Sequence, residues 1–281
     1  MYKTTMQAMK ILSLQDEEGK WGNFHSMSKF VNTTITTEQA LSRLKRLGYT
    51  IEDECIKRAV EYLSACLSGE KSIPDRVEGD FRCWDCFVKL MLSCRIREFT
   101  AANDQANEIA EKWAQLIKLT FEGGSFDGEK YTEEFKSIFN VPQKGDRLKD
   151  FTNFYVVSVT PDFLGAKSQQ LYMEHILNKD DGIYYIYNDK LSVLPERFDS
   201  LKASRYIAAM ELLVNLGAAK HKLGYVLEWL EDNRRGNGQW DMGQSVNDKV
   251  YFPLSENWRK AQTRVDDCTR RISALVERLK V

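Results

Sequence analysis

The sequence has almost no net charge and no long apolar run. Its 40 Lys and Arg residues nearly balance 41 Asp and Glu residues, so no overall field favours binding to nucleic acid or to an anionic membrane. No apolar run approaches the roughly 20 residues needed to cross a bilayer, and the residues after Met1 lack the apolar core of a signal peptide. We therefore expect no nucleic-acid partner, no transmembrane segment and a cytoplasmic location.

Complete catalytic signatures are also missing. The glycine-rich segment 123–125 lacks both the glycine pattern and the lysine of a phosphate-binding loop. The three histidines are dispersed, and no Ser-His-Asp or Cys-His spacing stands out. Glycosidases use two carboxylates across a cleft, and nothing in the sequence pairs the acidic residues that could serve: Asp80, Asp85, Glu133 and Glu256. The sequence alone therefore does not reveal a reaction.

The six cysteines lie inside helical patterns rather than in a short disulfide framework, which favours reduced, mostly buried thiols. Only Cys83 and Cys86 have a recognisable spacing. A Cys-x-x-Cys pair is half of a zinc site or a redox motif, but no second pair accompanies it. We expect buried core thiols here, with metal binding as the alternative, and we predict no metal and no cofactor elsewhere.

What the sequence does contain is helical periodicity of two kinds. Segments 6–14, 50–67, 109–120 and 223–230 each carry one apolar stripe opposite a polar face, which is typical of outer helices. Segment 201–216 is apolar nearly all round, so we expect an inner helix that is buried on most sides. Segments 83–94 and 154–159 have a similar character. These two kinds of helix predict an all-α fold.

Glycine-bearing turns recur at intervals of 50 to 59 residues, and a regular period of this length is expected of stacked or circular repeats. The turn glycines are Gly19, Gly69, Gly123, Gly182 and Gly238. About five hairpins, each made of an outer helix, a turn and an inner helix, fit the whole length. No break in composition suggests a second domain, so we expect residues 1–281 to form a single domain.

Two of these turns carry a family resemblance. Gln15-x-x-x-Gly19-x-Trp21 has the spacing of the QW repeat of squalene and oxidosqualene cyclases, and residues 236–240, with Gly238 and Trp240, resemble a degenerate second copy. In that family the motif joins an outer to an inner helix. The resemblance implies the α/α-toroid of terpenoid cyclases and protein prenyltransferases, in which inner helices surround a central cavity. Such cavities are the usual place for a ligand.

The catalytic motifs of these families are not reproduced. Class II cyclases protonate an alkene with D-x-D-D, whereas residues 264–267 read Arg-Val-Asp-Asp, and an arginine there favours carboxylate over acid. We interpret Asp266 and Asp267 as a solvated or salt-bridged pair. Residues 188–196 match the magnesium motif of class I synthases by letter, but Pro195 interrupts the helix that the motif needs. The zinc-binding D-x-C spacing of prenyltransferases is absent at Cys83–Cys86.

The remaining clue is the polar residues on the inner helices, because charges inside a ring are normally paired or in contact with a ligand. On this basis we nominate the charged residues Asp85, Arg205 and Arg264, with aromatic walls formed by Trp84, Phe154, Tyr155, Tyr206 and Trp258. For Arg205, an ion pair with Glu211 that ties helices together is the alternative.

Three functions stay open at this point. The first is a toroid that binds a small, largely apolar, isoprenoid-like molecule without catalysis. The second is a terpenoid cyclase or prenyltransferase-type enzyme with an unrecognised acid, for which Asp80 and Asp85 are the candidates. The third is a protein-interaction scaffold whose centre is filled by side chains.

Overall fold

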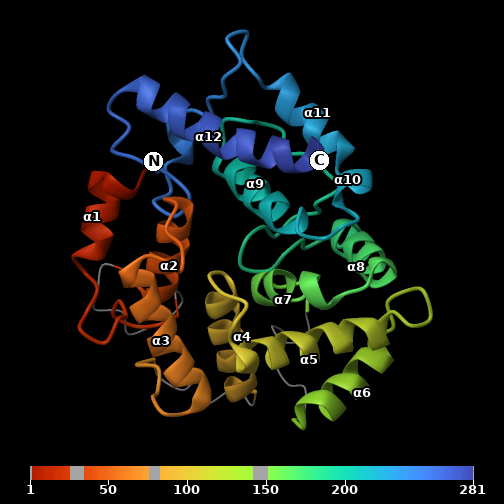
Figure 1. Cartoon of the computed structure of the whole chain (residues 1–281). Helices are drawn as coiled ribbons and strands as arrows, with labels where there is room; N and C mark the ends of the chain where they lie inside the picture. The colour runs from red at the N-terminus through yellow and green to blue at the C-terminus, as the bar shows by residue number, and fades with distance from the viewer. Residues whose placement is uncertain (1, 26–34, 76–82, 142–150, 281) are drawn as a thin grey trace. The chain divides into compact units, whose positions relative to one another are not determined.

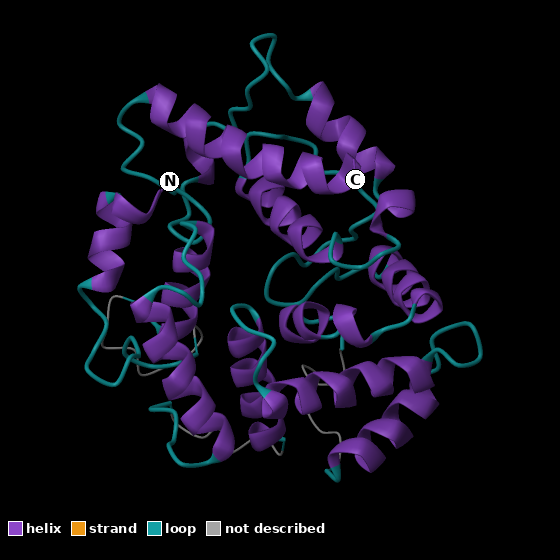
Figure 2. Ribbon diagram, in the orientation of Figure 1, coloured by secondary structure: helices purple, strands orange, loops and turns teal. Residues whose placement is uncertain are grey.

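The computed structural model describes residues 2–25, 35–75, 83–141 and 151–280. These residues form helices joined by turns, as Figure 2 shows. No β-strand occurs among them; two isolated bridges, Asn153 with Tyr184 and Ile183 with Tyr187, are the only extended pairings there. The prediction of an all-α fold is confirmed. In the described ranges, no helix is both long and apolar enough to span a membrane.

The chain divides into two compact units. The first runs to Ala110 and includes Leu254–Glu256, and the second comprises Glu111–Pro253 and Asn257–Val281. The boundary lies within one long helix, α5 (Asp104–Thr120), so this helix contributes residues to both units. The expectation of a single domain over residues 1–281 stays a prediction.

Two helices of the first unit have start signals that are readable in the sequence. Thr5 accepts a hydrogen bond from the N–H of Ala8 at the start of the first helix, and Thr36 and Gln39 form a reciprocal capping box before the second. In chain order the elements before α5 are η1 (Tyr2–Thr4), α1 (Met6–Leu12), α2 (Thr37–Arg46), α3 (Glu54–Ser68) and α4 (Trp84–Arg97), labelled in Figure 1.

Helix α3 begins later than the sequence pattern suggests. Thr50 and Asp53 look like the first and fourth residues of a capping box, yet Asp53 is itself the N-cap and the helix starts at Glu54. The Asp53 carboxylate accepts from the backbone N–H of Thr50 over 2.7 Å and from Lys3 Nζ over 2.6 Å. It therefore stabilises the turn before the helix. Helix α3 then packs against α4, the next helix along the chain.

The second unit holds the more apolar helices. Helix α9 (Leu201–Leu213) buries eight of its 13 residues, which confirms the prediction of a helix that is buried on most sides. The predicted helix 154–159 is also present and ends just before Pro161, as proline requires. The remaining elements are α6 (Gly128–Phe139), α7 (Phe154–Val159), η2 (Pro161–Phe163), α8 (Ala166–Asn178), α10 (Ala219–Lys222), α11 (Gly224–Asp232), η3 (Gln244–Val246) and α12 (Ala261–Lys280).

Large rings fill the core of each unit. In the first unit Trp21 and Phe24 are fully buried, as are Leu41 and Leu44 of α2. In the second, Phe151 stacks between Tyr131 and Tyr172, with ring centroids 5.0 and 5.4 Å apart. Buried rings of this size contribute much of the apolar surface that each unit removes from water.

Candidate functional site

The first turn, residues 15–21, is a closed set of hydrogen bonds. Gln15 Nε2 donates to the carbonyl oxygens of Gly19 and Cys55, each over 2.8 Å. Gly19 has φ +94°, a conformation that favours glycine. The indole N–H of Trp21 donates to the carbonyl of Ile11 over 2.8 Å. The amide side chain and the indole thus fasten the turn to the end of α1 and to α3.

The second turn, residues 234–240, repeats this arrangement. Arg234 Nε donates to the carbonyl of Gly238 over 2.9 Å, and Gly238 has φ +84°. The indole N–H of Trp240 donates to the carbonyl of Leu230, ten residues before it, over 2.6 Å. Arg234 therefore has the position in this turn that Gln15 has in the first. Comparison of the sequences alone does not show this, because the N–H group belongs to a guanidinium here and to an amide there.

A threonine clamps each turn to the next long helix that it meets. Thr37 Oγ1 of α2 accepts from the backbone N–H of Trp21 over 2.9 Å and donates to its carbonyl over 3.0 Å. Thr269 Oγ1 of α12 makes the same two bonds to Trp240, over 3.0 and 3.3 Å. The five motif residues nominated as structural, Gln15, Gly19, Trp21, Gly238 and Trp240, thus lie in two equivalent turns.

Arg264 is held in an ion pair with Asp241, the residue that follows Trp240. Its Nε and Nη2 atoms bind the two carboxylate oxygens over 2.7 and 2.8 Å, and Arg235 adds a third contact of 2.6 Å. The hydrogen bonds from Arg264, followed by the backbone N–H of Gly243 and the charges of the two arginines, lower the pKa of Asp241 to about 2. The neighbouring Asp266 is exposed at the surface. Arg264 thus stabilises the second turn rather than extending freely toward a ligand.

The other charged nominees lie at the surface. Arg205 is exposed although it is on α9, and Glu211 is paired with Arg271 instead. The Asp85 side chain is 80% exposed and forms an ion pair with Lys89 over 2.7 Å. Asp80 lies outside the described residues. Arg205 and Asp85 are thus each exposed on their own helices, and their role in a ligand site stays a prediction.

The aromatic nominees Phe154 and Tyr155 do join a cluster at the start of α7. Tyr155 meets Tyr185 with centroids 5.5 Å apart, and Tyr184 meets Tyr185 at 4.1 Å. Backbone hydrogen bonds hold the two segments together: Phe154 N–H donates to the carbonyl of Tyr184 over 3.1 Å. Tyr185 has φ +76°, which is rare for a bulky residue. We call Phe154, Tyr155, Tyr184 and Tyr185 the tyrosine cluster; all but Tyr155 are partly exposed.

The two other aromatic nominees of these helices differ in exposure. Tyr206 is fully buried in α9, where its hydroxyl donates to the carbonyl of Leu191 over 3.0 Å. Burial is the main reason that its pKa is raised above the ordinary value. Trp84 is half-buried at the first position of α4, with its ring 6.1 Å from that of Phe87. Tyr206 therefore has a core position, whereas Trp84 reaches solvent.

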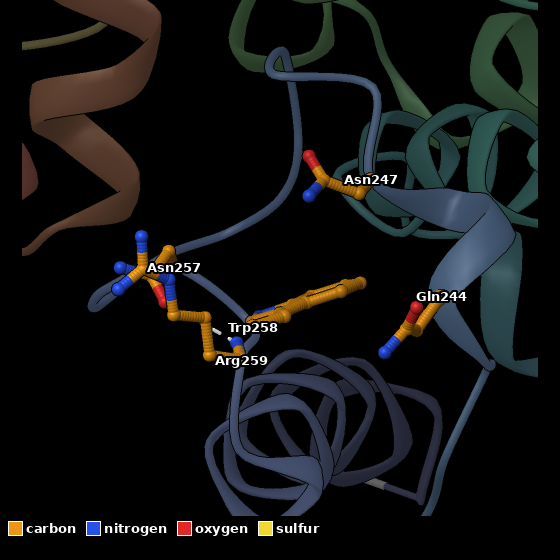
Figure 3. Close-up of a pocket in the computed structure, with 5 residues that line it drawn as sticks. All are labelled: Gln244, Asn247, Asn257, Trp258 and Arg259. Atoms are coloured by element: carbon orange, nitrogen blue, oxygen red, sulfur yellow. Dashed lines mark hydrogen bonds between the residues drawn. The ribbon is translucent and has the colours of Figure 1, made fainter.

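Trp258 lines a pocket of about 330 Å³ in the second unit, drawn in Figure 3. Its indole N–H donates to Asp267 over 2.9 Å, and Asp267 is fully buried. The figure shows the indole lying between the side chains of Asn247 and Gln244. Four polar side chains complete the lining: Gln244, Asn247, Asn257 and Arg259. The nomination of Trp258 as the wall of an apolar ligand site stays a prediction.

Two buried ion pairs were not predicted from the sequence. In the first unit Glu38 of α2 binds Arg95 of α4 over 3.1 Å and His25 Nδ1 over 2.7 Å. In the second, Arg271 of α12 binds Glu211 of α9 over 2.7 Å. Each pair joins two helices, and burial in pairs is how proteins accommodate such charges. The one sequence feature that could have predicted these ion pairs is a charged residue on the otherwise apolar face of a helix.

No family of known proteins can be assigned to this chain from these features. No group of three or more His, Cys, Asp or Glu side chains in the described ranges is placed to hold a metal ion. No family model, no curated protein and no solved structure matches the sequence or the fold.

Proposed function

We propose that the chain is an α/α-toroid of the terpenoid cyclase type, with about five helical hairpins, that binds a small, largely apolar, isoprenoid-like molecule. The observation that carries this proposal is the equivalence of the two turns. Trp21 and Trp240 each donate to a carbonyl ten residues earlier and each bind a threonine hydroxyl through both backbone groups. A repeated turn with the same bonds supports a helical repeat.

The helices beside the turns support the same repeat. Helices α1 and α11 precede the two turns, and each presents one buried face. Helices α2 and α12 receive the threonine clamps, and each is tied to a further helix by a buried ion pair, through Glu38 and Arg271. A helix before and a helix after each turn is the hairpin order that the toroid requires.

The tyrosine cluster supports the apolar ligand. Phe154, Tyr184 and Tyr185 are partly exposed, and aromatic faces gain energy by covering apolar surface while a phenol keeps a polar edge. Such a wall suits a branched hydrocarbon chain with one polar end. By contrast, a carboxylic acid that protonates an alkene must be kept from ionising by its surroundings. Asp85 is in solvent beside Lys89, which favours binding over catalysis at that residue.

Native mass spectrometry of the whole chain with farnesol, squalene and geranylgeranyl diphosphate tests the proposal. We expect at least one of them to remain bound. Phe154→Ala and Tyr184→Ala should each weaken binding about tenfold, which corresponds to about 1.4 kcal/mol. The matched control is Phe126→Ala, because Phe126 is an exposed ring in a different aromatic stack, 4.5 Å from His175.

Two results would contradict the proposal. One is that none of the three probes binds. The other is that Phe126→Ala weakens binding as much as Phe154→Ala does, since the tyrosine cluster would then have no special role. Conversion of any probe to a product would replace the binding function with an enzymatic one.

A further inference from the structure

We propose that Cys83 and Cys86 form a reversible intrachain disulfide, which makes the start of α4 a site of thiol–disulfide exchange. The inference is independent of the proposed ligand. Neither residue is in a disulfide in this structure; Cys83 is buried and Cys86 is half-buried. Their positions, their access and the contrast with the other cysteines carry the argument.

The first turn of α4 brings the two cysteines within bonding range. Cys83 is the N-cap of the helix, and the N–H of Phe87 donates to its carbonyl over 3.0 Å. Residues 83–87 therefore form one closed α-helical turn. In that geometry two residues three apart have Cα atoms about 5 Å apart. Disulfides form when this distance is about 4.4 to 6.8 Å, so the bond needs side-chain rotation rather than movement of the helix.

Other cysteines on the same helices do not meet this condition. Cys55 and Cys66 both lie on α3, and eleven residues of helix separate them by about 16 Å. Cys94 is eight residues beyond Cys86 on α4, which corresponds to about 12 Å.

Access decides the order of the reaction. Cys86 reaches solvent, whereas Cys83 is only 2% exposed. The Cys86 thiolate attacks one sulfur of a small disulfide such as oxidised glutathione, which forms a mixed disulfide and releases one glutathione thiolate. Cys83, as thiolate, then attacks the Cys86 sulfur and releases the second. The two cysteine protons pass to the two released thiolates, so one small disulfide is reduced as one protein disulfide forms.

The test equilibrates the whole chain in mixtures of reduced and oxidised glutathione, followed by acid quenching, alkylation, digestion and mass spectrometry. We expect the peptide that carries both cysteines to become two hydrogens lighter and to escape alkylation at both positions. Dithiothreitol should reverse this change. In Cys83→Ser the second attack is impossible, so Cys86 should accumulate as the mixed disulfide with glutathione, at least tenfold above the wild-type level.

The matched control is Cys66→Ser, which removes a half-buried cysteine of α3 and should leave the oxidation of Cys83 and Cys86 unchanged. The proposal is overturned if the wild-type chain keeps both thiols in the most oxidising mixture. It is equally overturned if Cys86 in the wild-type chain stops at the mixed disulfide, because Cys83 would then not reach it. Far-ultraviolet circular dichroism of the oxidised chain should retain the helical signal, which shows that the reaction takes place in the folded protein.

Discussion

Arg234 has the same position in its turn that Gln15 has in the first turn, and each side chain donates to the carbonyl of a glycine four residues later. The two side chains differ in charge and in size, yet each supplies an N–H group at the same place. The hydrogen bond, rather than the residue type, is what the two turns have in common.

The two turn glycines should respond differently to alanine. Both have positive φ, which costs about 1 kcal/mol for alanine. A Cβ at Gly19 would lie 2.5 Å from the carbonyl oxygen of Arg58, whereas at Gly238 the nearest atom is Nη2, at the end of the Arg234 side chain, at 3.4 Å. We expect Gly238→Ala to lose about 1 kcal/mol and Gly19→Ala about 3 kcal/mol or more in urea unfolding. Equal losses of unfolding free energy in the two variants would show that the backbone angle φ alone determines the cost of alanine.

Replacing Trp240 by phenylalanine should remove a buried hydrogen bond. The variant leaves the carbonyl of Leu230 without the indole N–H that it accepts at present, and the smaller ring leaves a gap in the core. We expect a loss of about 2 to 4 kcal/mol. Trp229→Phe is the control, because Trp229 is half-buried on the adjacent helix α11, and it should lose less than half as much. Urea unfolding followed by far-ultraviolet circular dichroism, a signal that does not rely on tryptophan fluorescence, measures the stability of both variants.

The threonine clamp gives a third prediction. Thr269→Val keeps the shape of the side chain but can neither accept from the Trp240 N–H nor donate to its carbonyl. Thr269→Ser keeps both bonds. Because unpaired backbone groups near the core are costly, we expect valine to destabilise by about 1 to 3 kcal/mol and serine by less than about 1 kcal/mol. Amide hydrogen exchange at residue 240 should accelerate only in the valine variant.

The Asp241 ion pair predicts a loss of stability in acid. The pKa of Asp241 falls from 3.8 to about 2 in the folded chain, chiefly through the hydrogen bond to Arg264. A lowered folded pKa adds stability above the unfolded pKa, and this contribution disappears as pH falls from about 4 to about 2. Its size is about 2 kcal/mol. In Asp241→Asn this part of the acid dependence should vanish, whereas Asp199→Asn, at an exposed carboxylate, should retain it.

Removing one partner of the buried ion pair should be costly. Arg271→Met leaves the Glu211 carboxylate without its two guanidinium contacts, and we expect a loss of about 3 kcal/mol. Arg205→Met, at an exposed position of α9, should change stability by less than about 0.5 kcal/mol. Thermal unfolding of the two variants distinguishes a supporting arginine from a surface one. A comparable loss in both would mean that Arg205 has a role that its exposure does not suggest.

Local patterns predicted the helices better than their exact ends. Segment 201–216 was recognisable because nearly all its residues are apolar, and helix α9 occupies its first 13 positions. At α3 the pattern placed the start three residues too early, because Asp53 bonds to the N–H of Thr50 in a turn as it would in a helix. A side chain that can satisfy the same backbone group in two conformations does not by itself fix the first residue.

Site residues were harder to predict, for a physical reason. Periodicity shows which face of a helix a residue lies on, but not which side chain approaches it from another helix. Arg264 finds its partner 23 residues away, and Arg271 finds Glu211 at a separation of 60. Both arginines follow the same helix pattern, and the nominee Arg205 has the same chemistry but points to solvent. The tyrosine cluster likewise joins segments whose pairing depends on the bridge at Asn153 and Tyr184.

Arg271 also fixes the rotation of α12 about its own axis. Its guanidinium donates to the Ser204 hydroxyl and carbonyl and to both oxygens of Glu211, while its plane lies over the rings of Tyr251 and Phe252. A slip of α12 by a single residue would turn this side chain by about 100° and break every one of these contacts together. Apolar side chains can still pack after a small rotation of a helix, whereas the arginine contacts cannot form, so Arg271 selects one orientation of α12.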